Sequence, residues 1–507
     1  MSLYPGILCA IVGFLTCWAL VPIIQRQALW RKVSRGGEFH HTHKGAIPRC
    51  GGLALVCAFV ASAVPAALLL PPTVTWVRSR LLIVVGAVAM FGLGFWDDVK
   101  GVGAKKKLLA QVVIAICMYF GGIQIEVFNN PFTRGDLPLG MFSMGATVLW
   151  LVALTNLINL IDGIDGLAGG VGFLLMCLVA QVGIGVQCGF STLVAAGMAG
   201  ALLGFLRYNF PPARIYMGDG GAYFLGFLIG VLSIVNAHKG SVAAGLIAPL
   251  FALALPIADV SLAVVRRGLK GLPIFRPDRK HIHHRLLQLG LSRRRAVLAL
   301  YSISLLCLAL ALGAFWLQGR LLPLFLGSLL LVLVMAGRTF GFGKDWRMIG
   351  TSLALRGEIR YALTLSQWLQ MEAERCDSVK DLWEDYQFIV RKLGFAEVEL
   401  KLSDGVNRWL AEAGDELEEP FARLRHEIPG GGSIELSARS EILPEKLFEV
   451  LGELAAEAWQ KAALRWQELN EVTVGFNAVA VKNVTRKAGE FKFAVPANRW
   501  RKKESLA

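Results

Sequence analysis

Residues 155–170 read TNLINLIDGIDGLAGG and join two long apolar runs, 141–161 and 167–187. Four polar residues recur here at every third position: Asn156, Asn159, Asp162 and Asp165. Each step of three turns a helix about 60° short of a full turn, so the four cannot share one helix face. The glycines between them predict that the helix breaks here. Ionisable side chains and irregular backbone are tolerated within a membrane protein only where they line a protein or water-filled cavity, so the stretch predicts a polar site between spans.

The whole chain is apolar for its length. It has 507 residues, 55% of them hydrophobic, and a mean hydropathy of +0.54. A bilayer core about 30 Å thick needs roughly 20 apolar residues per helix, and about eleven such runs occur, all before residue 340. They are 3–25, 51–70, 80–96, 107–126, 141–161, 167–187, 189–207, 221–236, 241–265, 296–316 and 319–337, of which 80–96 and 221–236 are short. Residues 1–340 are therefore expected to form an all-α polytopic membrane domain. The first run is long and lacks a basic leader, which favours a retained span over a cleaved signal peptide.

The net charge of +15 is distributed unevenly between the loops. Basic residues gather in alternate loops, and the positive-inside rule places these loops and the C-terminus in the cytoplasm, with the N-terminus outside. Nucleic-acid binding is the rival explanation of a basic chain. It is disfavoured because most of the charge lies in loops tethered to spans. The nine cysteines include no CxxC pair, which is typical of small buried residues and not of disulfides or a metal site.

The composition changes near Gly341, where a charged and periodic region begins. Alternating apolar and polar residues predict strands at 397–402, 424–428 and 434–438. An apolar stripe predicts a helix from about Pro444. We therefore expect residues 341–470 to form a cytosolic α+β domain, whose helix–strands–helix order resembles a shortened GAF-like sensor domain that binds a regulator or partner. Residues 471–507 are basic and are expected to form a loose tail.

Two adjacent carboxylates, Asp97 and Asp98, lie in GLGFWDDVKG at the end of the run 80–96. They cannot both be buried and charged without a cation nearby. The alternative is a charge pair that caps a helix end. Lys107 follows one short loop later, in the basic run 105–107, which can hold a lipid phosphate or simply follow the positive-inside rule.

A third polar group lies in YNFPPARIYMGDGGAYFLG, residues 208–226, and contains Asn209 and Asp219. A lone aspartate between glycines is common in turns. Together with the other two groups, however, it completes a set of oxygen ligands at one membrane face. Hard cations such as Mg²⁺ prefer carboxylate and amide oxygens together with substrate phosphates.

A histidine-rich tract, FRPDRKHIHHR, occupies residues 275–285. Such a tract can bind zinc. Its arginines repel a cation and suit a phosphate anion, so we interpret it as a phosphate-binding loop. An ordinary basic loop is the alternative, and it is the better interpretation for His40, His41 and His43.

These motifs resemble those of the polyprenyl-phosphate N-acetylhexosamine-1-phosphate transferase family, glycosyltransferase family 4. The matching strings lie between residues 43 and 290 and are HKGAIPRCGG, FWDDVKG, NLINLIDGIDGLAGG, NFPPARIYMGDGGAYFLG and PDRKHIHHRLLQLG. The HIHH form resembles the bacterial branch that uses UDP-N-acetylglucosamine. The translocase branch, which uses UDP-MurNAc-pentapeptide, has an acid after its histidines where this chain has Arg285.

The resemblance implies transfer of a sugar-1-phosphate, N-acetylglucosamine-1-phosphate in that branch, from a UDP-sugar to undecaprenyl phosphate, with release of UMP. It implies Mg²⁺ as the cofactor, with Mn²⁺ as a substitute, and a multi-pass protein of the bacterial plasma membrane with a cytoplasmic site. Such a reaction is the first membrane step of cell-wall or lipopolysaccharide synthesis. A translocase-type transferase, a cation-coupled transporter and a membrane-bound sensor are the alternatives, and a homodimer is left open.

The resemblance also implies roles for individual residues. Asn159 and Asp219 are the implied metal ligands. The implied catalytic carboxylates are Asp97, Asp98, Asp162 and Asp165, the first two positioning the lipid phosphate. The implied substrate contacts are Lys44, Arg49, Lys107 (lipid phosphate), Asn156, Asn209 (uridine), Arg279, His281, His283 and His284.

Overall fold

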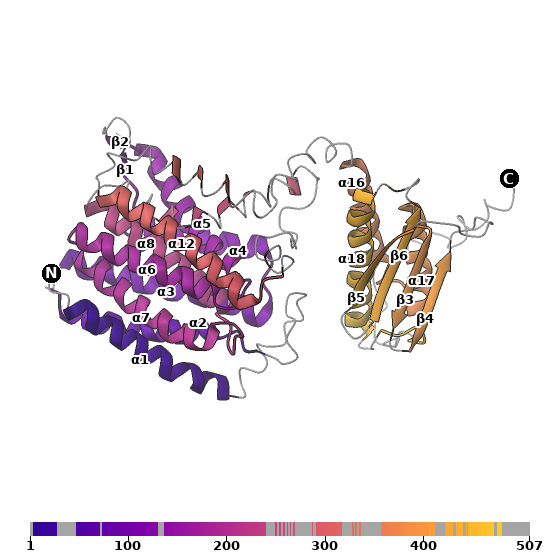
Figure 1. Ribbon diagram of the computed structural model, residues 1–507, viewed down its shortest axis with the longest axis horizontal. Helices are drawn as coiled ribbons and strands as arrows, with labels where there is room; N and C mark the ends of the chain where they lie inside the picture. The colour runs from indigo at the N-terminus through magenta and orange to yellow at the C-terminus, as the bar shows by residue number, and fades with distance from the viewer. Residues whose placement is uncertain are drawn as a thin grey trace, which may run out of the picture. The chain divides into compact units, whose positions relative to one another are not determined.

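The computed structural model describes a large part of the chain. The described residues are 4–27, 47–70, 74–129, 136–239, 290–316, 356–402, 404–410, 421–428, 432–439, 445–470 and 474–478, with single positions between 249 and 286, between 327 and 335, and at 443. The chain divides into two compact units, Met1–Leu353 and Ala354–Ala507, and each is described by itself (Figure 1).

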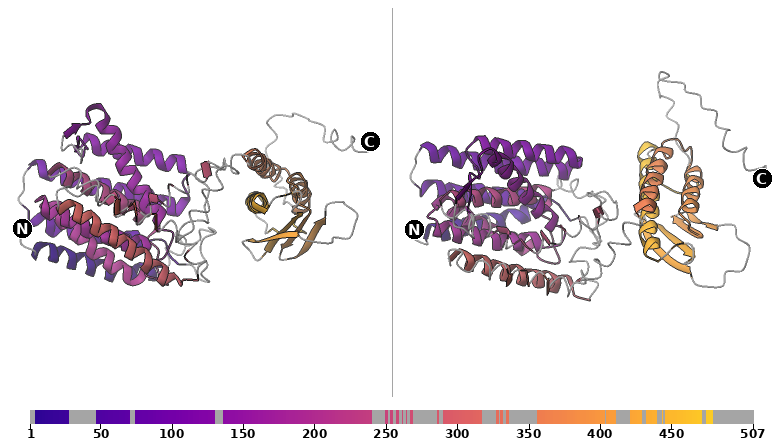
Figure 2. Two further views of the ribbon diagram at one scale, coloured as in Figure 1. Left: turned by 45° about the horizontal axis from the view of Figure 1, so that its top comes forward. Right: turned by 90° about the horizontal axis from the view of Figure 1, so that it is seen from above.

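The first unit is a bundle of helices, seen from three directions in Figures 1 and 2. Its described helices are α1 (Tyr4–Arg26), α2 (Gly51–Leu68), α3 (Val74–Lys100), α4 (Ala104–Phe120), α5 (Ser143–Ile161), α6 (Leu167–Gly185), α7 (Gly189–Asn209), α8 (Gly218–Lys239) and α12 (Arg293–Trp316). Between α4 and α5 lies a short antiparallel hairpin of β1 (Val127–Asn129) and β2 (Asp136–Pro138), followed by one 3-10 turn, η2 (Gly140–Phe142).

Six described helices are long and apolar enough to cross a membrane: Tyr4–Arg26, Ser79–Lys100, Gly140–Ile161, Leu167–Gly185, Gly189–Asn209 and Gly218–Ala237. Large apolar side chains project from the outside of the bundle, among them Ile11 and Trp18 of α1, Val85 of α3 and Leu109 of α4. Such a surface suits lipid and not water. The chain is therefore a multi-pass membrane protein. The expected runs 51–70, 107–126 and 296–316 lie in helices α2, α4 and α12, which are not among the six, and 241–265 and 319–337 lie largely outside the described residues. The count of eleven spans therefore stays a prediction.

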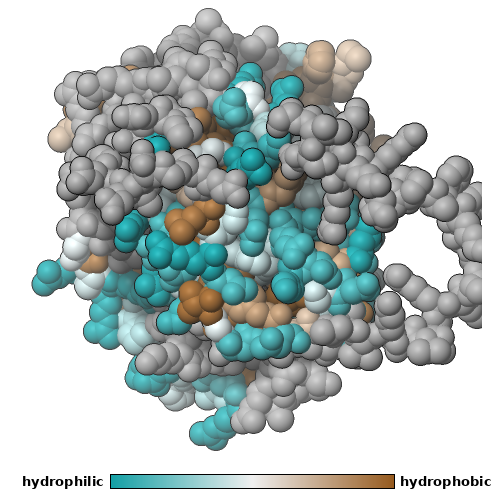
Figure 3. All heavy atoms as spheres, turned by 90° about the vertical axis from the view of Figure 1, so that its right-hand side faces the viewer, coloured by the Kyte–Doolittle hydropathy of each residue, from teal (hydrophilic) through white to brown (hydrophobic). Residues whose placement is uncertain are grey.

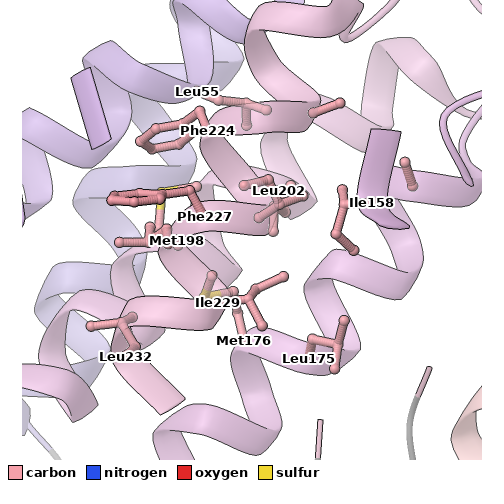
Figure 4. Packing of buried hydrophobic residues seen from close by; sticks show 14 of the residues in the cluster. Leu55, Ile158, Leu175, Met176, Met198, Leu202, Phe224, Phe227, Ile229 and Leu232 are labelled. Atoms are coloured by element: carbon pink, nitrogen blue, oxygen red, sulfur yellow. The ribbon is translucent and has the colours of Figure 1, made fainter. Parts of the chain in front are cut away.

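Helix α8 forms the centre of the bundle. It packs against α2, α3, α5, α6 and α7, and 94% of its apolar span lies buried inside the protein. Figure 4 shows Phe224, Phe227 and Leu232 of α8 among side chains of the neighbouring helices. A helix that is apolar all round is typically buried. The run 221–236, short in the sequence, is thus the core of a longer helix, Gly218–Lys239.

Glycines let three helices meet at the start of α8. A Cβ on Gly94 of α3 would lie 2.4 Å from the Asp219 carbonyl oxygen, and one on Gly52 of α2 would lie 2.4 Å from the Gly221 nitrogen. Real Cβ atoms do not approach this closely, so only glycine allows these backbones to touch. The contacts bring the ends of α2 and α3 against the first turn of α8.

The second unit is α+β. Its elements are α16 (Arg356–Glu372), α17 (Val379–Lys392), β3 (Glu397–Leu402), β4 (Gly405–Leu410), β5 (Phe421–Ile428), β6 (Gly432–Arg439) and α18 (Glu445–Asn470). The strands form an antiparallel sheet in the order β4-β3-β6-β5, and Figure 2 shows the helices together on one side of it. The three predicted strands and the helix near residue 444 are confirmed, whereas β4 was not predicted.

The sheet of the second unit has two different faces. Val398 and Leu400 of β3 pair with Leu436 and Ile434 of β6, and all four are buried on one face. The neighbouring positions of the other face carry charges, for example Arg408 beside Glu397. This alternation along the strands is typical of an antiparallel sheet with one packed and one solvated face. In the view of Figure 3, onto the right-hand side of Figure 1, the described residues are mainly hydrophilic, with small separate apolar areas.

Candidate active site

The polar stretch between α5 and α6 breaks the helix, as its glycines predict. Helix α5 ends at Ile161 and α6 begins at Leu167. Gly166, which precedes α6, has a φ of +79°, a conformation that favours glycine. The Tyr301 hydroxyl of α12 donates a hydrogen bond to the Gly166 carbonyl. The break therefore presents non-helical backbone and two aspartates at one end of the bundle.

Four side chains from four helices meet beside this break; we call Asp97, Lys107, Asn159 and Asp219 the charged cluster. The Lys107 ammonium donates a hydrogen bond to Asp97 Oδ2, and its Nζ lies 3.6 Å from Asp219 Oδ2. Asn159 Nδ2 donates to Asp219 Oδ1 over 3.0 Å. The Lys107 cation thus lies between the carboxylates of Asp97 and Asp219, and Asp219 also accepts a hydrogen bond from the Asn159 amide. These residues lie in separate motifs of the sequence.

Asp98 lies next to this cluster but has different partners. Its two carboxylate oxygens accept the backbone N–H groups of Asp219 and Gly220, each over 3.0 Å. These belong to the first turn of α8, whose N–H groups have no partner within the helix. A negative charge at that end also suits the helix dipole. Asp98 of α3 therefore caps α8 and holds the backbone that carries Asp219.

The segment around Arg49 runs beside the start of α8. Tyr216 N donates to the Pro48 carbonyl, and Gly51 N donates to the Tyr216 carbonyl, both over 2.9 Å. A Cβ on Gly218 would lie 2.4 Å from the Arg49 carbonyl oxygen and 2.7 Å from Asp98 Oδ2. The backbone of Arg49 is thereby fixed beside the Asp98 cap.

Asp162 lies just beyond the end of α5. Desolvation raises the pKa of its carboxyl well above the usual range, and the carboxylates of Asp219 and Asp98 raise it further. The Arg49 charge acts in the opposite direction. In the free protein this carboxyl therefore holds its proton more tightly than an ordinary aspartate does.

Asp165 and Asn209 tie the helix break to the loop before α8; we call this pair the loop clasp. Asn209 Oδ1 accepts the Gly166 N–H over 3.0 Å, and its Nδ2 donates to the Ile215 carbonyl over 2.8 Å. Asp165 Oδ2 accepts the Ala213 N–H over 3.0 Å. Both side chains are buried. The implied uridine contact of Asn209 and catalytic role of Asp165 stay predictions, because these polar atoms bond to backbone.

Asn156 lies one turn before Asn159 on α5. Its Nδ2 donates to Gln111 Oε1 of α4 over 2.7 Å and to the Val152 carbonyl over 2.8 Å. Gln111 and Tyr301 are polar contacts of this region that the sequence motifs did not indicate. A single amide in the apolar stretch LLAQVVIAI, 108–116, was the available signal for Gln111.

Five predicted substrate contacts lie outside the described residues: Lys44, Arg279, His281, His283 and His284. Within the described part of the chain, no group of three or more His, Cys, Asp or Glu side chains is arranged to hold a metal ion. The nine cysteines all lie among the described residues, and none of them forms a disulfide.

Asn159 and Asp219 are a suitable pair of ligands for a magnesium ion that is bound together with substrate phosphates. Asn159 and Asp219 supply an amide and a carboxylate side by side. Magnesium in phosphate-handling sites is commonly held by one or two carboxylates plus substrate phosphates and water. The donor set is therefore the right chemical type for a magnesium–diphosphate complex.

The sequence profile of the glycosyl transferase family 4 matches residues 80–237. That range includes the whole charged cluster and the loop clasp. Over 313 residues the chain is 34% identical to the probable undecaprenyl-phosphate N-acetylglucosaminyl 1-phosphate transferase of Bacillus subtilis (strain 168), covering 61% of this chain and 86% of that protein. The chain belongs to glycosyl transferase family 4.

Two other relatives extend the comparison. The decaprenyl-phosphate N-acetylglucosaminephosphotransferase of Mycobacterium tuberculosis (strain CDC 1551 / Oshkosh) is 30% identical over 285 residues, 51% of this chain and 70% of that protein. The phospho-N-acetylmuramoyl-pentapeptide-transferase of Staphylococcus aureus (strain JH9) is 28% identical over 324 residues, 59% of this chain and 95% of that protein.

Proposed function

We propose that this protein transfers N-acetylglucosamine-1-phosphate from UDP-N-acetylglucosamine to undecaprenyl phosphate and releases UMP. One observation carries the proposal: Lys107, Asp97, Asn159 and Asp219 converge at span ends in a member of glycosyl transferase family 4. The similarity to the Bacillus subtilis relative favours N-acetylglucosamine as the sugar and undecaprenyl phosphate as the acceptor.

The reaction requires little from a protein base. A phosphate monoester has a second pKa near 6, so the lipid phosphate is largely a dianion at neutral pH. Its oxygen attacks the β-phosphorus of the UDP-sugar and forms a new P–O bond. The bond between β-phosphorus and the bridging oxygen breaks, and UMP leaves with the electron pair. Catalysis then consists mainly of bringing two anions together and stabilising charge.

The residues of the site divide this work. Lys107 binds the lipid phosphate, exchanging its contact with Asp97 or Asp219 for a phosphate oxygen. Asn159 and Asp219 would hold Mg²⁺, or Mn²⁺ in its place, which would supply positive charge against the diphosphate. Asp98 keeps the first turn of α8 in position. Asp97 orients the Lys107 ammonium.

The positive-inside rule supports a cytoplasmic position for this site and for the C-terminus, with eleven spans in total. We further propose that the second unit is a GAF-like regulatory or docking domain that binds a regulator or a partner. Every motif that matches the family lies between residues 43 and 290, so the second unit is not required for the chemistry.

Metal removal and a substrate panel test the proposal together. Purified full-length protein is incubated with undecaprenyl phosphate and UDP-N-acetylglucosamine, UDP-N-acetylgalactosamine or UDP-MurNAc-pentapeptide, and UMP is measured. We expect release with UDP-N-acetylglucosamine, its loss in EDTA and its recovery with Mg²⁺ or Mn²⁺. Full activity in EDTA would remove the metal from the proposal. Release only with UDP-MurNAc-pentapeptide would make the protein a translocase-type transferase, and no release with any donor would leave a transporter as the better alternative.

A further inference from the structure

The polar contacts between α4 and α5 form two levels. Lys107 and Gln111 are four residues apart on α4, and Asn156 and Asn159 are three apart on α5, so each pair shares one face of its helix. The first level joins Lys107 and Asn159 through Asp219. The second level, one turn along, is the direct bond from Asn156 Nδ2 to Gln111 Oε1 at 2.7 Å.

Gln111 is a polar side chain buried in an otherwise apolar stretch of a helix whose outer face is exposed, so its position calls for a physical reason. Its side chain is 1% exposed, whereas Leu109 and Val113 on the outside of α4 are 66% and 52% exposed. Its Nε2 is buried and has no hydrogen-bond partner among the described residues. Burying an amide in an apolar interior is costly unless the amide is hydrogen-bonded. The bond of its Oε1 to Asn156 offsets part of this cost.

Asp97 holds the start of α4, because its Oδ1 accepts the Val102 N–H over 2.6 Å and its Oδ2 accepts the Lys107 ammonium. Helix α4 begins at Ala104, and its N-cap residue Gly103 makes no side-chain capping bond. The first turn of α4, which carries Lys107, therefore has no side-chain cap on its own N–H groups, and helix ends without one tend to fray. Gln111 is the next polar side chain along the helix, and residues 108–116 contain no other. Its bond to Asn156 thus fixes the rotation of α4 one turn from Lys107.

We propose that Gln111 is a positioning residue of the transfer site, which acts through Asn156 to set the place of Lys107 between Asp97 and Asp219. The proposal rests on the proposed function, because it assigns Lys107 to the lipid phosphate. Loss of the Gln111–Asn156 bond lets the first turn of α4 shift, so that Lys107 meets the lipid phosphate less often. Asn159 and Asp219, which are proposed to hold the metal on the diphosphate, lie on α5 and α8, so we expect binding of the UDP-sugar to be unchanged.

Steady-state kinetics of the full-length protein test this role. We compare wild type with Gln111→Met and Asn156→Leu, which keep side-chain size and remove the bond, while varying undecaprenyl phosphate and UDP-N-acetylglucosamine separately. Each variant should lose about tenfold in kcat/KM for undecaprenyl phosphate, a barrier change of about 1.4 kcal/mol. The KM for the UDP-sugar should stay within about twofold of wild type, which is well below the tenfold effect expected for the lipid.

Three controls separate positioning from general damage. Thr155→Val alters a neighbouring buried hydroxyl that donates to the Leu151 carbonyl of its own helix, and should leave both kinetic constants unchanged. The exchanged pair Gln111→Asn with Asn156→Gln restores one long and one short amide across the interface, and should recover most of the loss. In a Lys107→Ala background, Gln111→Met should have no further effect on the lipid KM.

The outcomes are distinct from those of the proposed function. A wild-type protein that releases no UMP contradicts the proposed function itself. An active wild type whose Gln111→Met and Asn156→Leu variants keep the lipid kcat/KM contradicts the positioning role. Equal losses for both substrates, or a further loss in the Lys107→Ala background, contradict it as well. If Gln111→Met fails to fold, Asn156→Leu and the exchanged pair carry the same test.

Discussion

The charged cluster and the loop clasp are built from the same residue types but bond differently. In the charged cluster, Lys107, Asp97, Asn159 and Asp219 contact one another through side chains. In the loop clasp, Asp165 Oδ2 and both polar atoms of the Asn209 side chain bond to backbone groups of the helix break and the loop before α8. Asp97 Oδ1 also accepts the Val102 backbone N–H over 2.6 Å. Lys107, Asn159 and Asp219 can therefore exchange their partners for substrate or metal without freeing backbone groups, whereas Asp97 and the loop clasp cannot.

Asp98 and Asp97 show that neighbouring residues of a single motif can bond in these two different ways. Asp98 adjoins Asp97 in the sequence, yet its carboxylate caps α8 while that of Asp97 faces Lys107. Adjacent acids in one motif can therefore hold different tasks: Asp98 caps α8, whereas Asp97 binds Lys107 and the Val102 N–H at the start of α4. Substitutions should separate the two by the size of the loss and by the variant that rescues it.

The largest effect is expected for Asp219→Ala. The variant removes the carboxylate that contacts both Lys107 and Asn159, and a loss of roughly 10³-fold in kcat is the scale of removing one group that stabilises charge in the transition state. The backbone N–H of residue 219 remains for the Asp98 cap, so the protein should stay folded. UMP release measures activity, and thermal unfolding in detergent checks the fold. Near-normal activity would exclude Asp219 from the charged cluster's chemistry.

Lys107→Ala should act mainly on the lipid substrate. Because its ammonium is the one cation of the charged cluster, its loss should raise the KM for undecaprenyl phosphate by about tenfold or more, with the KM for the UDP-sugar retained. Lys106→Ala, at an exposed neighbouring position, is the matched control and should change little. An unchanged lipid KM in Lys107→Ala would count against the lipid-phosphate role.

Asp98 should be sensitive to the shape of its replacement and not only to its charge. Asp98→Asn keeps one oxygen that can accept from the first turn of α8, so a loss of about tenfold is expected. Asp98→Ala leaves two N–H groups without a partner, and an unsatisfied buried donor costs about 1–3 kcal/mol. It should therefore lose more activity and unfold at a lower temperature. Identical behaviour of the two variants in both assays would contradict the capping role.

The smallest effect is expected from removal of the second unit. A chain ended after about residue 340 should keep its specific activity in detergent within roughly tenfold, about 1.4 kcal/mol in the barrier. The family motifs all precede that point. UMP release by the shortened and full-length proteins provides the comparison. A shortened protein that folds but has no activity would show that the second unit contributes to the site.

The sequence predicted much of this architecture, because the signals were local. The break after Ile161 followed from its glycines, and the strands Glu397–Leu402 and Gly432–Arg439 followed from alternation. The edge strand Gly405–Leu410 was missed because an edge exposes alternate positions and tolerates polar residues on both faces. The central place of α8 was also hidden, since apolarity on all sides suits a lipid-facing helix and a buried one alike.

The division of labour between polar residues could not be predicted. Spacing indicated that Asp97, Asp98 and Asp165 belong to one region, but not which oxygen accepts which N–H group. Those bonds join residues more than forty positions apart, such as Asp165 with Ala213 and Asp98 with Asp219. Gln111 was missed for the same reason, because its partner lies on another helix.

Tracing the phosphorus of the donor is the most direct test of the transfer reaction. UDP-N-acetylglucosamine labelled with ³²P at the β-phosphate is incubated with the purified protein and undecaprenyl phosphate, and lipid and aqueous products are separated. Sugar-1-phosphate transfer places the label in the lipid fraction and releases unlabelled UMP in equal amount. Label that stays in the water phase as UDP, with sugar alone in the lipid, would contradict the account.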